Sequence, residues 1–159
     1  MPMILGIDLG TTNSSAAFFD GRDITLIPND RGSRTTPSVI ALSENAEILV
    51  GESARNQAVL NSAHTIRNAK RLMGTGKQLN FGSRLLRPED ALSYILSSLK
   101  KDAENYLGQD IAEAVITVPA YFSEIQRRAV REAGRIAGFD VRRLLNEPTA
   151  AAIAWAWSA

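Results

Sequence analysis

The residues near the N-terminus have the types and spacing that a phosphate-binding hairpin requires. The apolar run Ile4-Leu5-Gly6-Ile7-Asp8-Leu9 carries one acid, Asp8, and leads into the turn Gly10-Thr11-Thr12-Asn13 before a second apolar run. A glycine followed by small hydroxyl residues lets backbone N–H groups point into a concavity that holds phosphate oxygens. Asp8 could organise a hydrated Mg²⁺, which needs few protein ligands. An ordinary β-hairpin with a glycine turn and an edge aspartate fits the same residues equally well.

The sequence does not match the other common phosphate-binding and catalytic motifs. Gly76-Lys77 has the form of the end of a P-loop, but Arg71 stands at the first glycine position and Gln78 replaces the Ser/Thr. The Gly74-Thr75-Gly76 stretch lacks the third glycine of a dinucleotide fingerprint. His64 is the one histidine and there is no cysteine, which leaves no support for a Ser-His-Asp triad or a cysteine zinc site.

Two further ionisable residues, Lys70 and Glu147, have ordinary interpretations when each is taken alone. A lone lysine in Asn68-Ala69-Lys70-Arg71 is normally a solvated surface residue, because buried lysines are rare. Glu147 follows a strand-like run and precedes Pro148, where an acid is favoured by the dipole of the next helix.

The elements that must position these residues follow from periodicity and turn signals. Alternation and Gly or Asp-Gly turns predict strands over 3–9, 14–19, 24–27, 38–42, 48–50, 114–118 and 141–145. Helices are expected over 53–60, from Pro88 to the stop at Gly108, from the capping box of Ser123 and Gln126 to Gly138, and from Pro148 onward. The 72–86 segment shows no clear period and is expected to be a loop or a small excursion. Ile125, Ala129, Ala133, Ile136 and Ala137 are expected to face inward.

Composition favours an ordinary globular domain without a strong electrostatic target. The chain has 159 residues and a formal net charge of +1, so nothing points to nucleic acid or to a membrane surface. No apolar run approaches the length of a membrane span, and the N-terminus lacks the basic region of a signal peptide. We therefore expect a cytoplasmic α/β protein in which antiparallel strands precede strand-helix units.

Five motifs in this chain resemble the DnaK-type seventy-kilodalton heat-shock chaperone family, and they occur in the order of that family. They are Ile7-Asp8-Leu9-Gly10-Thr11-Thr12-Asn13-Ser14, Arg34-Thr35-Thr36-Pro37-Ser38, Lys70-Arg71-Leu72-Met73-Gly74, Ala114 to Phe122, and Asn146-Glu147-Pro148-Thr149-Ala150-Ala151-Ala152. The resemblance covers essentially the whole chain. It implies the first lobe of an actin-like, ribonuclease-H-like ATPase domain, with a mixed sheet and flanking helices.

The resemblance also implies roles for individual residues. Gly10, Thr11, Thr12 and Asn13 would hold the β- and γ-phosphates of ATP or ADP, and Asp8 would order the waters around Mg²⁺. Lys70 would position the attacking water and stabilise developing phosphate charge, and Glu147 would organise the metal and water side. Pro119 and Arg127 match the pair that relays nucleotide state toward a peptide-binding domain.

At the level of the whole protein, the resemblance implies a chaperone that couples ATP hydrolysis to client binding. Clients would bind through a C-terminal domain absent from this sequence, a J-domain co-chaperone is expected, and the isolated lobe would be inactive. Within the lobe, residues of roughly 39–110 would form a small outer subdomain inserted into a core of 1–38 and 111–159. The short segment after Gly74 resembles the specialised HscC-type branch. A non-catalytic interaction module, or another actin-superfamily ATPase or kinase lobe, is the alternative.

Overall fold

A computed structural model describes residues 3–147, and its centre is a six-stranded mixed sheet. The strands are β1 (Ile4–Leu9), β2 (Asn13–Phe19), β3 (Ile24–Leu26), β4 (Thr36–Pro37), β10 (Glu113–Val118) and β11 (Asp140–Asn146). Their order is β11-β10-β1-β2-β3, and β4 pairs with β2. Neighbours β1, β2 and β3 are antiparallel, whereas β10 runs parallel to β1 and to β11. The predicted mixed sheet is therefore confirmed.

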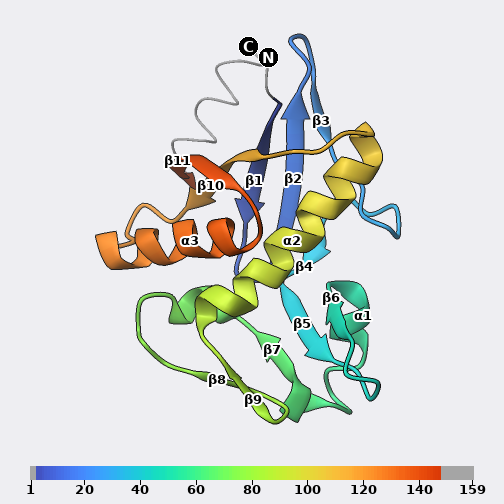
Figure 1. The fold of residues 1–159 in the computed structure, drawn as a ribbon, viewed down its shortest axis with the longest axis vertical. Helices are drawn as coiled ribbons and strands as arrows, with labels where there is room; N and C mark the ends of the chain where they lie inside the picture. Colours follow the sequence, from blue (N-terminus) through green and yellow to red (C-terminus); the bar gives the residue numbers. More distant parts are fainter. Residues whose placement is uncertain (1–2, 148–159) are drawn as a thin grey trace.

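Alternation along β1 and β10 separates the two faces of this sheet. Leu5, Ile7 and Leu9 are buried, whereas Asp8 lies on the other face. The buried residues of β10 repeat with the same period, as expected for strands with one face against the core. Figure 1 shows α2 (Pro88–Leu107) and α3 (Glu124–Ile136) together in front of this sheet. Asp8 is thus on the sheet face that looks away from the hydrophobic core.

A second group of elements lies at the other end of the molecule in Figure 1. It contains a three-stranded sheet of β5 (Val39–Leu42), β6 (Ile48–Val50) and β7 (Thr65–Arg67), a hairpin of β8 (Leu79–Phe81) and β9 (Arg84–Leu86), the helix α1 (Glu52–Asn56) and the 3₁₀ turns η1 (Ser62–His64) and η2 (Ala69–Leu72). These elements fall within the predicted outer subdomain, although its exact division from the core stays a prediction. The hairpin shows that the 72–86 segment is more ordered than its sequence indicated, because Phe81 is fully buried and anchors it.

Helix α2 connects the two groups of elements (Figure 1). It begins at Pro88, where the missing N–H costs no helical hydrogen bond, and ends at Gly108, whose φ of 69° is left-handed. Its apolar stripe, which includes Leu92, Ile95, Leu96 and Leu99, is buried in the core. Both ends of this helix were predicted from the sequence.

Helix α3 begins at the predicted capping box, in which the Gln126 N–H donates to Ser123 Oγ at 3.3 Å. Its buried residues are Ala129, Val130, Ala133 and Gly134. The predicted inward positions of Ile125 and Ile136 are wrong, because these side chains are 64% and 40% exposed. The helix packs through its small residues instead: a Cβ on Gly134 would lie 2.4 Å from Cγ2 of Val141. Because α3 lies so close to β11, the larger side chains of Ile125 and Ile136 remain outside the contact and are exposed to solvent.

The helix expected from Pro148 lies outside the described residues. Within residues 3–147, no helix is long and apolar enough to cross a bilayer.

Candidate functional site

The predicted site residues gather where β1, β10 and β11 end. Because these three strands are parallel, their carboxyl ends meet at one edge of the sheet, which is the usual place for a site in an α/β layer. Asp8 lies one residue before the end of β1, Pro119 follows β10 directly, and Glu147 follows β11 directly. The topology therefore assembles residues that are far apart in the sequence.

The turn from Gly10 to Asn13, called the 10–13 turn below, joins β1 to β2 at this edge. A Cβ on Gly10 would lie 1.9 Å from the carbonyl oxygen of Asn13, so no other residue fits there without moving the backbone. Within the described part of the chain, the amide N–H groups of Thr11 and Thr12 have no hydrogen-bond acceptor. The turn thus presents unsatisfied donors in an exposed position, which suits an anionic ligand.

Ser38 holds the 10–13 turn from the side of β4 and β5. Its hydroxyl donates to the carbonyl oxygen of Gly10 at 2.8 Å, and its amide donates to the carbonyl oxygen of Thr12 at 2.8 Å. The Ser14 hydroxyl lies 2.8 Å from the Ser38 hydroxyl. Because the single hydroxyl proton of Ser38 is donated to the Gly10 carbonyl, the Ser14 hydroxyl is the donor in this pair. Both serines are buried.

This contact determines where the amides of the turn point. All described peptide bonds are trans, and in a trans peptide the C=O and the following N–H point to opposite sides. With the carbonyl of Gly10 directed at Ser38, the free N–H group of Thr11 is directed away from Ser38. Ser38 therefore fixes the direction of one free donor of the turn.

Lys70 is buried, contrary to what a lone lysine in this stretch suggests. Asn68 adopts a left-handed conformation with φ of 56°, and the short η2 turn that follows carries Lys70 into the protein, where it is 3% exposed. Its ammonium donates to the carbonyl oxygen of Leu9 and, at 2.8 Å, to Oε1 of Glu147. The Phe122 ring lies 5.8 Å from Nζ, a cation–π distance. The positive charge thus sits beside the start of the 10–13 turn.

Asp8 is held on the open face of the sheet. The Thr117 hydroxyl donates to its Oδ1 at 3.0 Å, and the second carboxylate oxygen has no protein partner within residues 3–147. That part of the chain contains no group of three or more His, Cys, Asp or Glu side chains able to hold a metal. A single fixed carboxylate fits Mg²⁺ that keeps most of its water ligands, and does not fit a metal enclosed by protein.

Pro119 and Arg127 are linked through Phe122, which lies in the turn between β10 and α3. The Phe122 N–H donates to the Pro119 carbonyl at 3.1 Å, and Arg127 donates to the Phe122 carbonyl at 3.1 Å. Arg127 also donates to Oδ1 of Asn146 at 2.7 Å, next to Glu147. This arginine is therefore bound at the site edge. Its predicted relay role stays a prediction.

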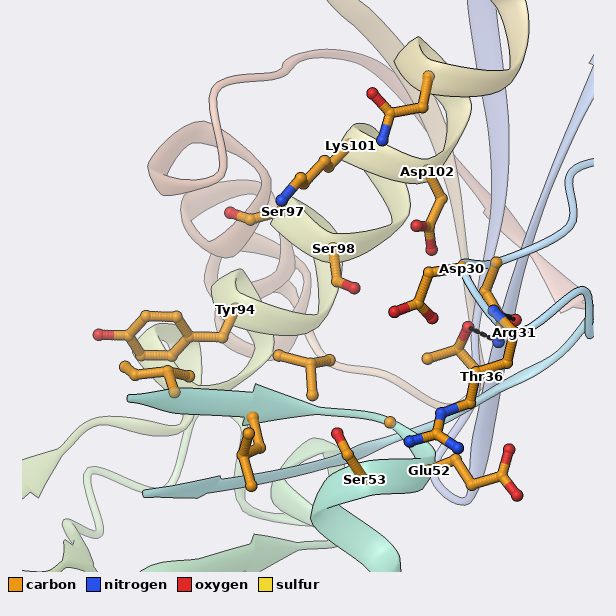
Figure 2. A pocket seen from close by; sticks show the side chains of 16 residues that line it. Asp30, Arg31, Thr36, Glu52, Ser53, Tyr94, Ser97, Ser98, Lys101 and Asp102 are labelled. Atoms are coloured by element: carbon orange, nitrogen blue, oxygen red, sulfur yellow. Dashed lines mark hydrogen bonds between the residues drawn. The ribbon is translucent and has the colours of Figure 1, made fainter. Parts of the chain in front are cut away.

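A larger cavity of about 550 Å³ lies apart from these residues, between α2, β6 and the 29–31 loop. Figure 2 shows the side chains of Asp30 and Asp102 beside one another in its lining. Burial raises the pKa of Asp102 to about 6, and the negative charge of Asp30 contributes to the rise.

With the geometry established, comparison with known proteins identifies the family. A profile of the Hsp70 protein family matches residues 4–81 and 76–158, which together span nearly the whole chain. The chain belongs to the Hsp70 family. It is also 53% identical over 153 residues to a relative, the chaperone protein DnaK of Thermosipho melanesiensis. That match covers 96% of this chain and 26% of the relative, so the chain spans about a quarter of the relative's length.

Membership in the Hsp70 family confirms the predicted family and the actin-like ATPase fold. The structure brings Asp8, the 10–13 turn, Lys70 and Glu147 to one edge, while the roles of these residues stay predictions. Sequence reasoning missed Ser14, Ser38, Thr117 and Phe122, which hold the others in place. Ser38 ends the Arg34-Thr35-Thr36-Pro37-Ser38 motif, so the motif signalled its importance without indicating its contact.

Proposed function

We propose that this chain is the first nucleotide-binding lobe of an Hsp70-type chaperone and that its site takes part in ATP hydrolysis. The observation that carries the proposal is the buried Lys70, which lies against Leu9 and Glu147 beside the free amides of the 10–13 turn. A buried lysine is rare and requires partners, so a fold that buries one next to an anion-binding turn is suited to phosphate chemistry.

The 10–13 turn would bind the phosphates of ATP or ADP. Its free N–H groups and the hydroxyls of Thr11 and Thr12 are donors, and Gly10 allows the close approach of the backbone. Such donors are fixed before the ligand arrives, so binding needs no rearrangement of the turn. Ser38 supports this arrangement from behind.

Lys70 would act on the transferring phosphoryl group. Phosphoryl transfer depends on positioning and on stabilising charge that spreads over the phosphate oxygens. The Lys70 ammonium is already held by the Leu9 carbonyl and the Glu147 carboxylate, so its direction is fixed. From this place it can donate to a phosphate oxygen or to the attacking water.

Glu147 and Asp8 would form the acidic side of the site. Glu147 is 42% exposed, which leaves one carboxylate oxygen able to accept a hydrogen bond from water while the other binds Lys70. Asp8, oriented by Thr117, would accept hydrogen bonds from water bound to Mg²⁺. When bound, Mg²⁺ supplies charge neutralisation between the phosphates.

At the level of the whole protein, we propose a cytoplasmic chaperone that couples ATP hydrolysis to the binding of client polypeptides, with a J-domain co-chaperone. These partners come from family membership and from the DnaK relative, which is far longer than this chain. The complete set of Asp8, Lys70 and Glu147 favours an ATPase over a non-catalytic interaction module.

The test replaces Lys70 in the full-length protein that contains this chain. Lys70→Ala is expected to lower single-turnover ATP hydrolysis by about a hundredfold or more, with ATP affinity largely preserved. Lys77→Ala, which removes an exposed lysine from a nearby loop, is the matched control and should leave the rate unchanged. Near-normal hydrolysis by Lys70→Ala would remove this lysine from the reaction, and no hydrolysis by the unmodified protein would contradict the proposed function.

A further inference from the structure

The cavity of about 550 Å³ between α2, β6 and the 29–31 loop lies apart from the residues of the proposed function. Its volume falls within the range of roughly 300–1,000 Å³ that small-molecule pockets occupy. Tyr94, Ser98 and Asp102 line it from α2, and their spacing places all three on one face of that helix. At a rise of about 1.5 Å per residue, Tyr94 and Asp102 are roughly 12 Å apart along the helix axis. The cavity is therefore elongated along α2.

The two ends of this cavity differ in chemistry. Figure 2 shows Tyr94 at one end and the side chains of Asp30 and Asp102 beside one another at the other end. Ser98 lies between the two ends (Figure 2). Strand β6 adds apolar surface to the lining through Ile48, Leu49 and Val50. A ligand that fills the cavity therefore needs an apolar portion and a polar group for the carboxylates.

The carboxylates of Asp30 and Asp102 have no partner in the part of the chain that the structure describes. Neither accepts a hydrogen bond or forms an ion pair there. Asp102 is partly buried, and its pKa rises to about 6 because of this burial and of the negative charge of Asp30. A cation between the two carboxylates would offset both effects. An unpaired, partly buried carboxylate in a cavity of this size is typical of a binding site.

The remaining charged side chains leave this end of the cavity negative. They are those of Arg31, Glu52 and Lys101. Figure 2 shows Lys101 extending toward Ser97 and Arg31 extending toward α1, so neither cation lies between the two aspartates. The lining thus has three carboxylates against two cationic groups, and the two aspartates are open to a cationic ligand.

The 29–31 loop is held in place before any ligand binds. The Asn29 side-chain amide donates to Oγ1 of Thr36 at 3.2 Å, and its Oδ1 accepts the N–H of Arg31 at 3.0 Å. Thr36 is itself buried in β4. These bonds fix the loop that carries Asp30, and a fixed site loses less entropy when it binds a ligand.

We propose that this cavity binds a small primary amine, whose ammonium group lies between Asp30 and Asp102 and whose alkyl or aryl portion extends along α2 toward Tyr94. An ammonium group has three donors, and the two carboxylates and the Ser98 hydroxyl are acceptors for them. A metal ion fits less well, because residues 3–147 contain no group of three or more His, Cys, Asp or Glu side chains able to hold one. The proposed amine site does not depend on ATP chemistry.

The first experiment titrates n-hexylammonium chloride into the full-length protein that contains this chain, at pH 7.5, and follows the ligand by NMR. Asp102→Asn and Asp30→Asn are each expected to weaken binding about five- to tenfold, which corresponds to the loss of one charge-assisted contact. Asp110→Asn, which removes an exposed carboxylate outside the cavity, is the matched control and should leave the affinity unchanged. Uncharged n-hexanol should bind about tenfold more weakly than the amine, with no difference between Asp102→Asn and the unmodified protein.

Absence of hexylammonium binding to the unmodified protein would overturn the amine site. So would equal affinities for Asp102→Asn and the unmodified protein, or an equal loss in Asp110→Asn. Tighter binding of Ca²⁺ than of the amine, lost in both Asp30→Asn and Asp102→Asn, would assign the carboxylates to a metal ion and would also overturn it.

The second experiment repeats the hexylammonium titration at pH 5, below the pKa of about 6 of Asp102. Protonation of Asp102 removes one of the two charges that bind the ammonium group, so the affinity of the unmodified protein should fall several-fold. The affinity of Asp102→Asn should not change between pH 7.5 and pH 5. The same pH effect in both proteins would show that Asp102 does not bind the amine.

Discussion

Nζ of Lys70 lies 2.8 Å from Oε1 of Glu147, although 77 positions separate the two residues in the chain. The lysine is 3% exposed and the glutamate 42%, so one partner of this ion pair is inside the protein while the other faces the open edge. The buried charge thus depends on a carboxylate that also contacts solvent.

Replacing Glu147 with glutamine tests this dependence. Glu147→Gln is expected to lower single-turnover ATP hydrolysis in the full-length protein at least tenfold, because Lys70 loses its charged partner and is no longer held in one direction. Glu132→Gln, which alters a surface pair with Arg135 on α3, is the control and should leave the rate unchanged. Equal rates for both variants would show that Glu147 has no part in the reaction.

Removing the Ser38 hydroxyl should affect phosphate binding specifically. Ser38→Ala is expected to weaken ADP binding to the full-length protein about five- to tenfold, because the Gly10 carbonyl loses its donor and the turn loses its orientation. Adenosine affinity should not change. Ser93→Ala removes another buried serine, whose hydroxyl donates to the Asp90 carbonyl at 2.6 Å, and serves as the matched control. Equal losses for ADP and adenosine would indicate a general structural defect.

The Asp30 and Asp102 pair predicts a pH dependence of stability. The pKa of Asp102 rises from 3.8 in its ordinary state to about 6 in the folded chain, so the folded state binds the proton more tightly than the unfolded state. Ionising Asp102 therefore lowers the free energy of unfolding. The loss is absent below about pH 4, grows as the pH rises from about 4 to about 6, and is complete above about pH 6.

Asp102→Asn should consequently stabilise the chain at pH 7.5 by roughly 1 kcal/mol or less, because the side chain is partly exposed and solvent screens its charge. At pH 4 the difference should vanish. Urea unfolding at both pH values is the measurement, with the exposed Asp110→Asn as the control. A stabilisation that is the same at both pH values would show that titration of Asp102 is not its cause.

The turn that contains Pro119 should transmit nucleotide state. Arg127→Ala removes donors to the Phe122 carbonyl and to Asn146, and is expected to reduce the effect of ATP on client-peptide affinity in the full-length protein. Pro119→Gly should act in the same direction. Because such coupling is reciprocal, peptide should also lose its effect on ATP affinity. Peptide titrations with and without ATP measure both, and Arg135→Ala is the control. An unchanged ratio of affinities would leave Arg127 a structural residue.

The isolated 159-residue chain should bind Mg-ATP only weakly and turn it over negligibly. The proposed phosphate contacts of residues 3–147 come from a single turn, so few contacts offset the entropy lost on association. Calorimetric titration is the measurement. Micromolar affinity with repeated turnover would mean that this lobe is sufficient by itself.

Local sequence signals predicted most element boundaries and part of the site. The ends of α2 and the start of α3 followed from Pro88, Gly108 and the Ser123 capping box, because these signals act through neighbouring backbone atoms. The inward faces of α3 were less predictable. Hydrophobicity alone favoured Ile125 and Ile136, whereas the helix approaches β11 so closely that only small residues fit between them.

The candidate site was also predictable only where local sequence determines the structure. The free amides of the 10–13 turn could be anticipated from Gly10 and the threonines that follow it. Lys70 could not be recognised from its local sequence, since its burial depends on the left-handed Asn68 and on partners from β1 and Glu147. It was singled out only because its motif resembles a family.

Ser38 has a consequence for how motion spreads through this lobe. It binds the 10–13 turn through its hydroxyl and its amide, and the next residue, Val39, begins the outer sheet and pairs with Arg67. Hydrogen bonds therefore connect the turn to the first residues of the outer sheet. An anion bound at the turn would restrain this sheet as well, which would couple ligand binding to the fluctuations of the outer elements.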